Sequence, residues 1–405
     1  MKIRLGVIFG GESVEHEVSI ISAIQAMNKM DSEKYEIIPI YITKDREWYT
    51  GEMLKEIDTY SDMSLIKKYA KNVVLYEKDG RFVLQNKKGF KTVVKELDIA
   101  FPIVHGTNVE DGVLQGYLQS VGIPFVGGDV YASVVGQDKV FMKQVFEADK
   151  LPVCKYVWFY DSEYEDDPDS IFANIKKLGY PVIVKPATLG SSVGIKTAKN
   201  QDELKTAIDD AIKYDNKIVV EKLVEDLMEV NISVLGNYEN QQVSAIEQVM
   251  PTKDFLTYED KYIGSSKVKG KLGGKFKSSK GMVSASRVIP APLEDGMKEE
   301  IEKVAIAAFK SLGSSGVVRI DFLVDKKNNK IYINEINNIP GSLSFYLWEP
   351  IGKEYTELLD DMINIGIRDY KKRLAKTHSF ETNILKGFTQ LGGFKGMKGA
   401  KGKLR

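Results

Sequence analysis

Four polar side chains lie near the ends of two apolar stretches that have the pattern of neighbouring strands. Arg319 and Asp321 are two residues apart in the first stretch, and Glu335 and Asn337 are two residues apart in the second. A strand repeats its facing every second residue, so each pair shares one face. If the stretches pair through the turn at 326–329, three oxygen-bearing side chains converge beside one guanidinium. Such ligands suit Mg²⁺, which proteins hold with a few carboxylates and the phosphates of a nucleotide.

A hairpin with a solvated polar face is the alternative interpretation of this pattern. The residues between the polar ones, such as Ile320, Phe322 and Ile333, are apolar enough for core strands. Polar side chains inside such strands need partners. The sharp turn at 337–341, Asn-Asn-Ile-Pro-Gly, then leaves backbone N–H groups nearby. The pattern therefore favours a metal site that handles phosphate, with an arginine where negative charge develops.

A second segment has the composition of an anion-binding turn. Lys185 lies near the end of the apolar stretch 182–186, and Leu-Gly-Ser-Ser-Val-Gly follows at 189–194. Small residues in a tight turn let backbone N–H groups point into one concavity, which binds anions. A plain hairpin and a surface lysine are the alternative, and no Gly-Lys-Ser/Thr opens a helix here as in a Walker loop. Together with a metal site downstream, the segment predicts phosphate binding.

Two further segments and one histidine give weaker indications of a ligand site. The stretch 219–224 resembles a strand at an interdomain hinge, a favoured place for a flat base, although a plain crossover strand fits equally well. The segment 10–17 follows the first strand, at the edge where doubly wound sheets bind ligands, but it lacks Gly-x-Gly-x-x-Gly. Glu15 there either complements a helix dipole or pairs with a substrate ammonium. His105 follows another strand, where it is either a ligand contact or a satisfied loop histidine, and no Ser-His-Asp set is evident.

Composition narrows the class of protein. A chain of 405 residues with 43% apolar and 28% charged residues is typical of globular proteins with two or three domains. Lys plus Arg and Asp plus Glu both number 57, so net charge indicates neither an acidic nor a basic partner. We find no apolar run that could span a bilayer. The single cysteine, Cys154, excludes an internal disulfide and fits a reducing cytoplasm, and three histidines with one cysteine do not make a usual zinc site.

The order of the expected elements predicts an α/β protein that opens with a βαβ unit. The expected strands are 3–9, 35–42, 98–104, 182–186, 194–197 and 218–222, and the expected helices are 15–30, 111–121, 131–149 and 201–213. Residues 45–95 are less regular and are expected to be peripheral. The predicted domains are 1–128, a substrate-binding domain; 129–224, a lid; 225–376, a catalytic domain; and 377–405, a tail.

Two segments differ from the rest in composition. Residues 261–293 contain no acidic residue, and 261–280 carry seven lysines and several glycines. A loop of this length inside a domain is typical of a lid, so we expect it to be mobile. The tail 377–405 is rich in glycine and lysine towards its end, which predicts a flexible, solvated segment.

Taken in order, these motifs resemble the D-alanine–D-alanine ligase family of the ATP-grasp superfamily over roughly residues 3–370. The segments that carry the resemblance are Gly-Gly-Glu-Ser-Val-Glu-His-Glu-Val-Ser (10–19), His-Gly-Thr-Asn-Val-Glu-Asp-Gly (105–112), Gln-Asp-Lys (137–139), Val-Ile-Val-Lys-Pro (182–186), Gly-Ser-Ser-Val-Gly (190–194), Tyr-Glu-Asp-Lys-Tyr (258–262), Arg-Ile-Asp (319–321) and Asn-Glu-Ile-Asn-Asn-Ile-Pro-Gly (334–341). The resemblance implies an N-terminal doubly wound, Rossmann-like domain followed by a two-part ATP-grasp fold.

The resemblance also implies an activity and its participants. It implies an ATP-dependent ligase that joins two D-alanines through an acyl phosphate, for peptidoglycan precursors. It implies two Mg²⁺ ions, with Mn²⁺ as an alternative, a cytoplasmic location and a homodimer, with neither nucleic acid nor membrane as partner. The implied catalytic residues are Glu15, Ser191, Tyr262, Arg319 and Gly341. The implied ATP-binding residues are Lys139, Lys185, Ser192, Glu221, Lys222, Val224, Glu229 and Lys261. The implied metal ligands are Asp321, Glu335 and Asn337, and the implied substrate contacts are His105, Ser344, Tyr346 and Leu347.

One position departs from the family pattern. Tyr346 stands where the family usually places a serine that receives the carboxylate of the second substrate. Either Tyr346 or Ser344 takes that carboxylate, or the second substrate is D-lactate, D-serine or another amino acid. Tyr262 favours D-alanine, because the family has phenylalanine there with hydroxy-acid acceptors. A nucleic-acid-binding protein that uses the basic segments is the alternative from another class, and the zero net charge counts against it.

Overall fold

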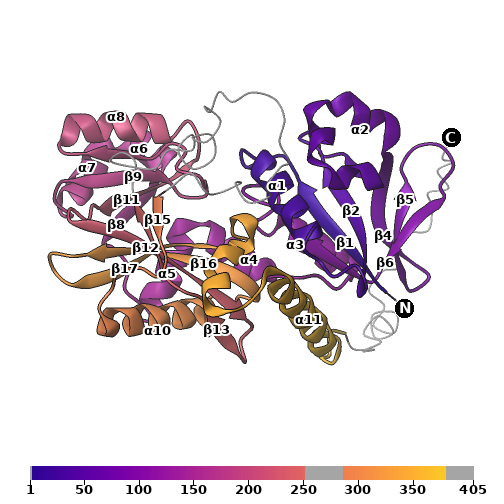
Figure 1. The fold of residues 1–405 in the computed structure, drawn as a ribbon. Coiled ribbons are helices and arrows are strands. Elements are labelled where there is room, and N and C mark those ends of the chain that lie inside the picture. The colour runs from indigo at the N-terminus through magenta and orange to yellow at the C-terminus, as the bar shows by residue number, and fades with distance from the viewer. Residues whose placement is uncertain (1, 251–285, 380–405) are drawn as a thin grey trace, which may run out of the picture. The chain divides into compact units, whose positions relative to one another are not determined.

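The computed structural model describes residues 2–250 and 286–379. Residues 1–367 form one compact unit, which contains three β-sheets, and residues 368–405 form a second. Figure 1 shows the course of the chain through these sheets. The domain boundaries predicted at 128, 224 and 376 stay predictions.

The first sheet has seven strands, and the three at one end of it are parallel. Its order in space is β6 (Val93–Leu97), β5 (Arg81–Asn86), β4 (Lys71–Lys78), β3 (Trp48–Thr50), β2 (Tyr35–Ile42), β1 (Ile3–Gly10) and β7 (Ile99–Pro102). β1 pairs in parallel with β2 and β7, as the βαβ opening predicts. The expectation that residues 45–95 are less regular than the rest is wrong, because this part of the chain supplies β3 to β6, which extend the sheet by antiparallel pairing.

Helix α1 (His16–Met27) packs on this sheet. Its buried side chains Ile20, Ile24 and Met27 recur at the helical spacing of four and three residues, which gives one apolar face toward the core. The helices of this part of the chain are α1 (His16–Met27), η1 (Glu52–Lys55), η2 (Ile57–Ser61), α2 (Met63–Tyr69) and α3 (Val113–Val121).

The expected linking helix at 131–149 is two helices, α4 (Val130–Gln137) and α5 (Lys139–Ala148). Asp138 interrupts them, because its backbone leaves the helical region with φ −87° and ψ 108°. Its carboxylate then accepts hydrogen bonds from the N–H groups of Val140 and Phe141, which caps α5. The break places Lys139 on the first turn of a new helix, with Lys143 one turn later.

The second sheet is antiparallel, with helices packed beside it (Figure 1). Its order is β10 (Lys196–Ala198), β9 (Val182–Pro186), β11 (Lys217–Lys222) and β8 (Tyr156–Tyr160). The helices are α6 (Asp161–Asp166), α7 (Pro168–Lys176) and α8 (Gln201–Ala211). Phe159, Ile175, Leu204 and Ile218 from these elements share one apolar core.

The third sheet carries the polar strands. Its order is β15 (Ser286–Val288), β14 (Glu247–Met250), β12 (Leu227–Gly236), β16 (Gly316–Asp325) and β17 (Lys330–Asn337), and β13 (Gln241–Val243) also pairs with β12. Helix α10 (Asp295–Ser311) packs on β12 and β16 through Ile301, Ala305 and Phe309. The apolar residues of the strands therefore face this helix, and their polar residues face the opposite side.

The chain after β17 turns back toward the first sheet. It forms η3 (Gly341–Leu347), η4 (Glu349–Ile351) and α11 (Tyr355–Leu374). The N–H of Ser342 donates to Ser22 Oγ of α1 over 2.9 Å, and the buried Trp348 Nε1 donates to Ser233 Oγ over 3.1 Å. These bonds hold the turn between α1 and β12. Among the described helices, none combines the length and the apolar character that crossing a membrane requires.

A glycine lets α11 lie close to the first sheet, and replacing it tests this packing. A Cβ on Gly366 would lie 2.9 Å from the carbonyl oxygen of Phe125, which is backbone and cannot move aside cheaply. We expect Gly366→Ala to lower the free energy of unfolding by about 1–3 kcal/mol. Gly296→Ala in α10 is the matched control, because no described residue beyond its own helix backbone and chain neighbours has an atom within 4 Å of the added Cβ. It should raise the free energy of unfolding by about 0.4–1 kcal/mol. Urea titration of both variants measures the difference, and equal midpoints would contradict this account.

Candidate functional site

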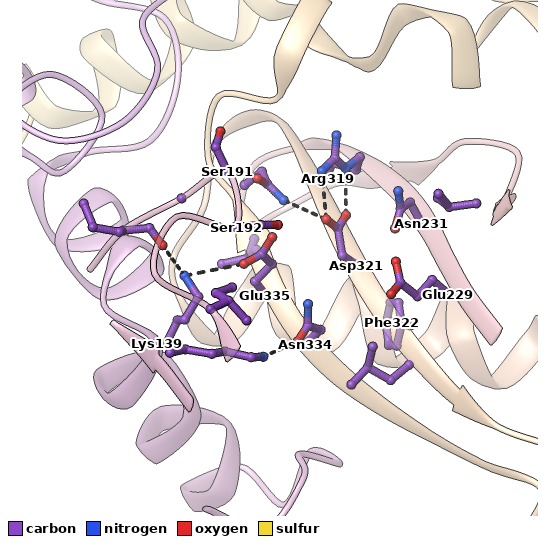
Figure 2. Close-up of a pocket in the computed structure, with 18 of the residues that line it drawn as sticks. Lys139, Ser191, Ser192, Glu229, Asn231, Arg319, Asp321, Phe322, Asn334 and Glu335 are labelled. Atoms are coloured by element: carbon purple, nitrogen blue, oxygen red, sulfur yellow. Dashed lines mark hydrogen bonds and ion pairs between the residues drawn. The ribbon is translucent and has the colours of Figure 1, made fainter. Parts of the chain in front are cut away.

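The predicted pairing of the polar strands is confirmed. β16 and β17 are antiparallel, with Asp321 opposite Glu335 and Arg319 opposite Asn337. The Arg319 guanidinium holds the Asp321 carboxylate with both a 2.7 Å and a 2.8 Å bond, and Asn337 Nδ2 donates to the same carboxylate over 3.2 Å (Figure 2). Burial alone would lower the pKa of Arg319, but the charge of Asp321 raises it well above its usual value. Arg319 is therefore a permanent cation inside the site.

Lys139 reaches the same site from the start of α5. Its ammonium donates to the carbonyl of Leu189 over 2.7 Å and lies 3.5 Å from the Glu335 carboxylate (Figure 2). The side chain is 7% exposed, so the ion pair is largely removed from solvent. Lys139 thus joins the serine-containing turn, residues 189–194, to the strand that carries Glu335.

Lys185 lies within a buried cluster of charges. Its ammonium donates to Asn334 Oδ1 over 2.9 Å and lies 3.2 Å from Glu221, and Lys143 lies 3.3 Å from the same carboxylate. Burial alone would raise the pKa of Glu221, but the two lysines outweigh it and hold the pKa below its usual value. Glu221 therefore stays ionised. The family resemblance implies that this residue helps to hold adenine. In the structure its side chain is 1% exposed and committed to two lysines.

Those predicted nucleotide residues that the structure describes border one cavity of about 290 Å³. Lys222 is fixed there by bonds from its ammonium to the carbonyls of Gly179 and Tyr180, over 3.2 and 2.9 Å. The cavity wall also includes Val224, Glu229, Ile183, Leu227, Leu323 and Phe322. Its apolar part is suited to a flat ring, since ligand cavities combine apolar walls with a few polar groups.

The serine-containing turn closes over Glu15. Ser191 Oγ donates to the Glu15 carboxylate, and Ser191 and Ser192 both have left-handed backbones, with φ of 54° and 60°. Such conformations cost free energy for residues with a side chain and persist where the surroundings impose them. A Cβ on Gly190 would lie 3.1 Å from the Glu15 carboxylate. Glycine at this position therefore lets the turn lie close to Glu15.

His105 and Glu110 line the same cavity as Glu15 and are buried. Burial lowers the pKa of His105 to about 4, and its Nε2 lies 3.0 Å from Ser22 Oγ. Glu110 accepts hydrogen bonds from the N–H groups of Gly106 and Ile339, each over 2.9 Å. Burial first, and then the charge of Glu15, raise the pKa of Glu110 to about 8. Through its two hydrogen bonds Glu110 joins the turn at Gly106 to the turn at Ile339, which are far apart in the sequence.

Three of the expected substrate contacts lie outside this cavity. Its described wall includes Gly341 but not Ser344, Tyr346 or Leu347. Ser344 and Leu347 are fully buried, and Ser344 Oγ has no hydrogen-bond partner among the described residues. The Tyr346 hydroxyl donates to Glu247 over 3.1 Å. These residues support the turn of η3 rather than face the cavity.

Sequence reasoning also missed residues of the site. Lys143, Asn334 and Arg287 are not among the predicted site residues. Lys143 contacts Glu221 and Asn334 contacts Lys185, both at the cavity, and Arg287 itself lies in the cavity wall. Alternation along the strand would place Asn334 on the face opposite Glu335. The register shift that pairs Asp321 with Glu335 but Phe322 with Ile333 leaves Asn334 as the extra residue of a bulge. The predicted residues Lys261 and Tyr262 lie outside the described residues.

Comparisons with known proteins agree along nearly the whole chain. A family model described as D-ala D-ala ligase N-terminus matches residues 4–128, and one described as D-ala D-ala ligase C-terminus matches residues 145–364. The D-alanine–D-alanine ligase of Thermosipho melanesiensis is 38% identical over 388 residues, which cover 95% of this chain and 98% of that protein.

Solved structures show the same relationship. The D-alanine-D-alanine ligase from Coxiella burnetii superposes with a TM-score of 0.77 at 27% identity, over 96% of this chain and 99% of that one. VanG D-Ala:D-Ser ligase from Enterococcus faecalis superposes with a TM-score of 0.73 at 30% identity, over 90% of this chain and 100% of that one.

Glu110 should make stability depend on pH. Its pKa is about 8 in the folded protein and ordinarily 4.5, so between these values folding binds a proton. Its contribution to the free energy of unfolding is therefore present in full below pH 4.5 and is lost as the pH rises to 8. We expect Glu110→Gln to remove this decline, which amounts to at most about 1.4 kcal/mol for each pH unit. Urea titrations of both proteins at pH 5 and pH 8 measure it, and an equal decline in both would contradict the assignment.

Proposed function

The chain belongs to the D-alanine–D-alanine ligase family, and from this premise we propose how its residues carry out the reaction. The protein is an ATP-dependent ligase that joins two D-alanines into D-alanyl-D-alanine for peptidoglycan precursors. One observation supports the residue assignment above all: a pair of opposed carboxylates, an arginine and two lysines border the same cavity as Glu15.

The chemistry of the family has two steps. A carboxylate oxygen of the first D-alanine attacks the γ-phosphorus of ATP, ADP leaves, and an acyl phosphate forms. The amine of the second D-alanine then attacks the acyl carbon, loses a proton, and expels inorganic phosphate with the electrons of the broken C–O bond. Positioning and charge neutralisation supply most of the catalysis in phosphoryl transfer.

The cavity offers a place for each part of ATP. Lys139, Lys185 and the turn at Ser192 would bind the phosphates, because their ammonium and N–H groups surround one concavity. The apolar wall beside Val224 would receive adenine, and Glu229 would accept hydrogen bonds from the ribose. The other residues predicted to hold adenine are Glu221 and Lys222, whose side chains are fixed by partners within the protein.

Two Mg²⁺ ions fit the polar end of the cavity, with Mn²⁺ as an alternative. Asp321 and Glu335 are opposed carboxylates, and Asn337 adds an amide oxygen, which is the oxygen-only set that Mg²⁺ prefers. When bound, the ions neutralise the charge that phosphoryl transfer places on the phosphate oxygens. Arg319 and Lys139, which hold these carboxylates in the structure, also neutralise the charge of the pair.

The remaining residues would act on the amino acids. Glu15, which Ser191 holds, would pair with the ammonium of the first D-alanine. Arg319 and the N–H of Gly341 would donate to the oxyanion that forms when the second amine attacks, since such donors must be in place beforehand. His105 is buried and neutral, so it would position the loop around Glu15 rather than carry charge. The roles expected of Lys261 and Tyr262 fall outside the described residues.

The identity of the second substrate is the most specific part of the proposal. The structural relative VanG is named as a D-Ala:D-Ser ligase, so serine belongs in the test. Phosphate release with ATP and a panel of D-alanine, D-serine, D-lactate and L-alanine, with the products identified by mass, decides it. We expect D-alanyl-D-alanine as the main product, and a main product from another acceptor would overturn this assignment. A cytoplasmic homodimer without nucleic-acid or membrane partners also stays a prediction.

Removing either opposed carboxylate should abolish ligation. An amide holds Mg²⁺ far less well than a carboxylate does, so we expect Asp321→Asn and Glu335→Gln to lose phosphate release while they remain folded. Asp325→Asn is the control on the same strand, because its carboxylate caps the following turn by accepting from Asn328. Circular dichroism verifies folding, and near-normal turnover of either cavity variant at ordinary magnesium would contradict the metal site.

Arg319→Lys should lose most of the rate although it keeps the charge. The planar guanidinium of Arg319 holds two oxygens at once, as it does those of Asp321, whereas lysine offers a point charge. Loss of one oxyanion donor typically costs about 10²–10³ in kcat. A kcat within a few-fold of the unchanged enzyme would make Arg319 a structural residue.

A further inference from the structure

Arg287 lies in the wall of the cavity although no motif indicates it. It belongs to β15 and pairs with Val249 of β14 at the edge of the third sheet. Its side chain is 20% exposed and borders the cavity that also contains Arg319 and Gly341. Arg287 is thus a second arginine in the wall where the second amine is proposed to attack.

A buried cluster holds Arg287 in place. Its Nη1 lies 3.2 Å from Glu247, and its guanidinium lies over the Tyr346 ring, 4.5 Å from the centroid. Glu247 is fully buried and also accepts hydrogen bonds from Asn231 Nδ2 over 3.0 Å and from the Tyr346 hydroxyl over 3.1 Å. A guanidinium stacked on a ring and fixed by a carboxylate loses little freedom when it binds an anion.

Arg287 keeps donors for a ligand. The ion pair of Arg287 with Glu247 uses Nη1, and the buried Nε has no hydrogen-bond partner among the described residues. Arg319 differs, because both Nε and Nη2 are bonded to Asp321. Glu247 divides its single charge among three donors, so it neutralises Arg287 less completely than Asp321 neutralises Arg319.

Neither of the two residues expected to receive the second carboxylate belongs to the described cavity wall. Tyr346 donates its hydroxyl to Glu247, and Ser344 is fully buried away from the cavity wall. An amino acid that enters the cavity must keep its carboxylate paired, because an unpaired charge out of water is costly. A planar arginine is well matched to a carboxylate.

We propose that Arg287 binds the carboxylate of the second amino acid and that Tyr346 and Glu247 are positioning residues for its guanidinium. The proposal rests on the ligase function proposed above and adds the group that recognises the acceptor. It accounts for a tyrosine at position 346, since the ring supports a cation instead of contacting the substrate. The acceptor class that fits is a small amino or hydroxy acid with a free carboxylate.

Competition between two acceptors tests the proposal. The enzyme receives ATP, D-alanine and D-alaninamide, and mass spectrometry measures the ratio of D-alanyl-D-alanine to D-alanyl-D-alaninamide. The amide has no carboxylate to be phosphorylated, so it can act as acceptor only. Both products arise from the same acyl phosphate, so partial unfolding or weaker ATP binding of a variant does not change the ratio.

The ratio should fall about ten- to a hundred-fold in Arg287→Gln, the typical effect of losing a hydrogen bond between charged groups. The ratio for Arg287→Lys should lie between that of Arg287→Gln and that of the unchanged enzyme. Tyr346→Phe should lower the ratio less than Arg287→Gln does. Arg46→Gln is the matched control, because this arginine is 72% exposed and pairs with Glu12. Its ratio should equal that of the unchanged enzyme.

Two results would overturn the assignment to Arg287. One is an unchanged ratio in Arg287→Gln, and the other is a larger fall in Tyr346→Phe than in Arg287→Gln, which would give the carboxylate to the phenol. Failure of the proposed function is distinguishable from both, because the unchanged enzyme would then make neither dipeptide product.

Discussion

Two carboxylates directly opposite each other on antiparallel strands repel, and the site is arranged around this constraint. Asp321 and Glu335 are register partners of β16 and β17. Like charges in such positions destabilise a sheet, so each needs a cation of its own. Arg319 serves Asp321 from the same strand, and Lys139 serves Glu335 from helix α5. The cations that make the sheet stable without ligands are also those suited to neutralise phosphate.

The same compensation recurs around the cavity. Glu221 lies between Lys143 and Lys185, and Glu247 lies beside Arg287. Buried ion pairs contribute little net stability, but removing one partner leaves an uncompensated charge, which is strongly unfavourable. The lysines are thereby held at defined places before any ligand enters. Preorganised charge of this kind is what phosphoryl transfer and acyl attack require.

The site also depends on bonds between distant turns. Glu110 ties the turn at Gly106 to Ile339, and Ser191 ties the serine-containing turn to Glu15. Both carboxylates lie close enough for the charge of Glu15 to raise the pKa of Glu110. The proposed amino-acid and phosphate sites are therefore coupled through a few hydrogen bonds rather than built separately.

The sequence by itself determined the polar strand pair, the tight turn at 189–194 and the βαβ opening, because alternation along strands and small residues in turns are local patterns. It did not reveal β3 to β6, whose pairing joins segments that are only half buried. Nor did it separate α4 from α5, where one capping side chain at Asp138 overrides a continuous helical pattern. Only the tertiary structure placed Tyr346 against Glu247 and brought Arg287 to the cavity. Those contacts join strand β15, strand β14 and the η3 turn, and no spacing within one segment encodes them.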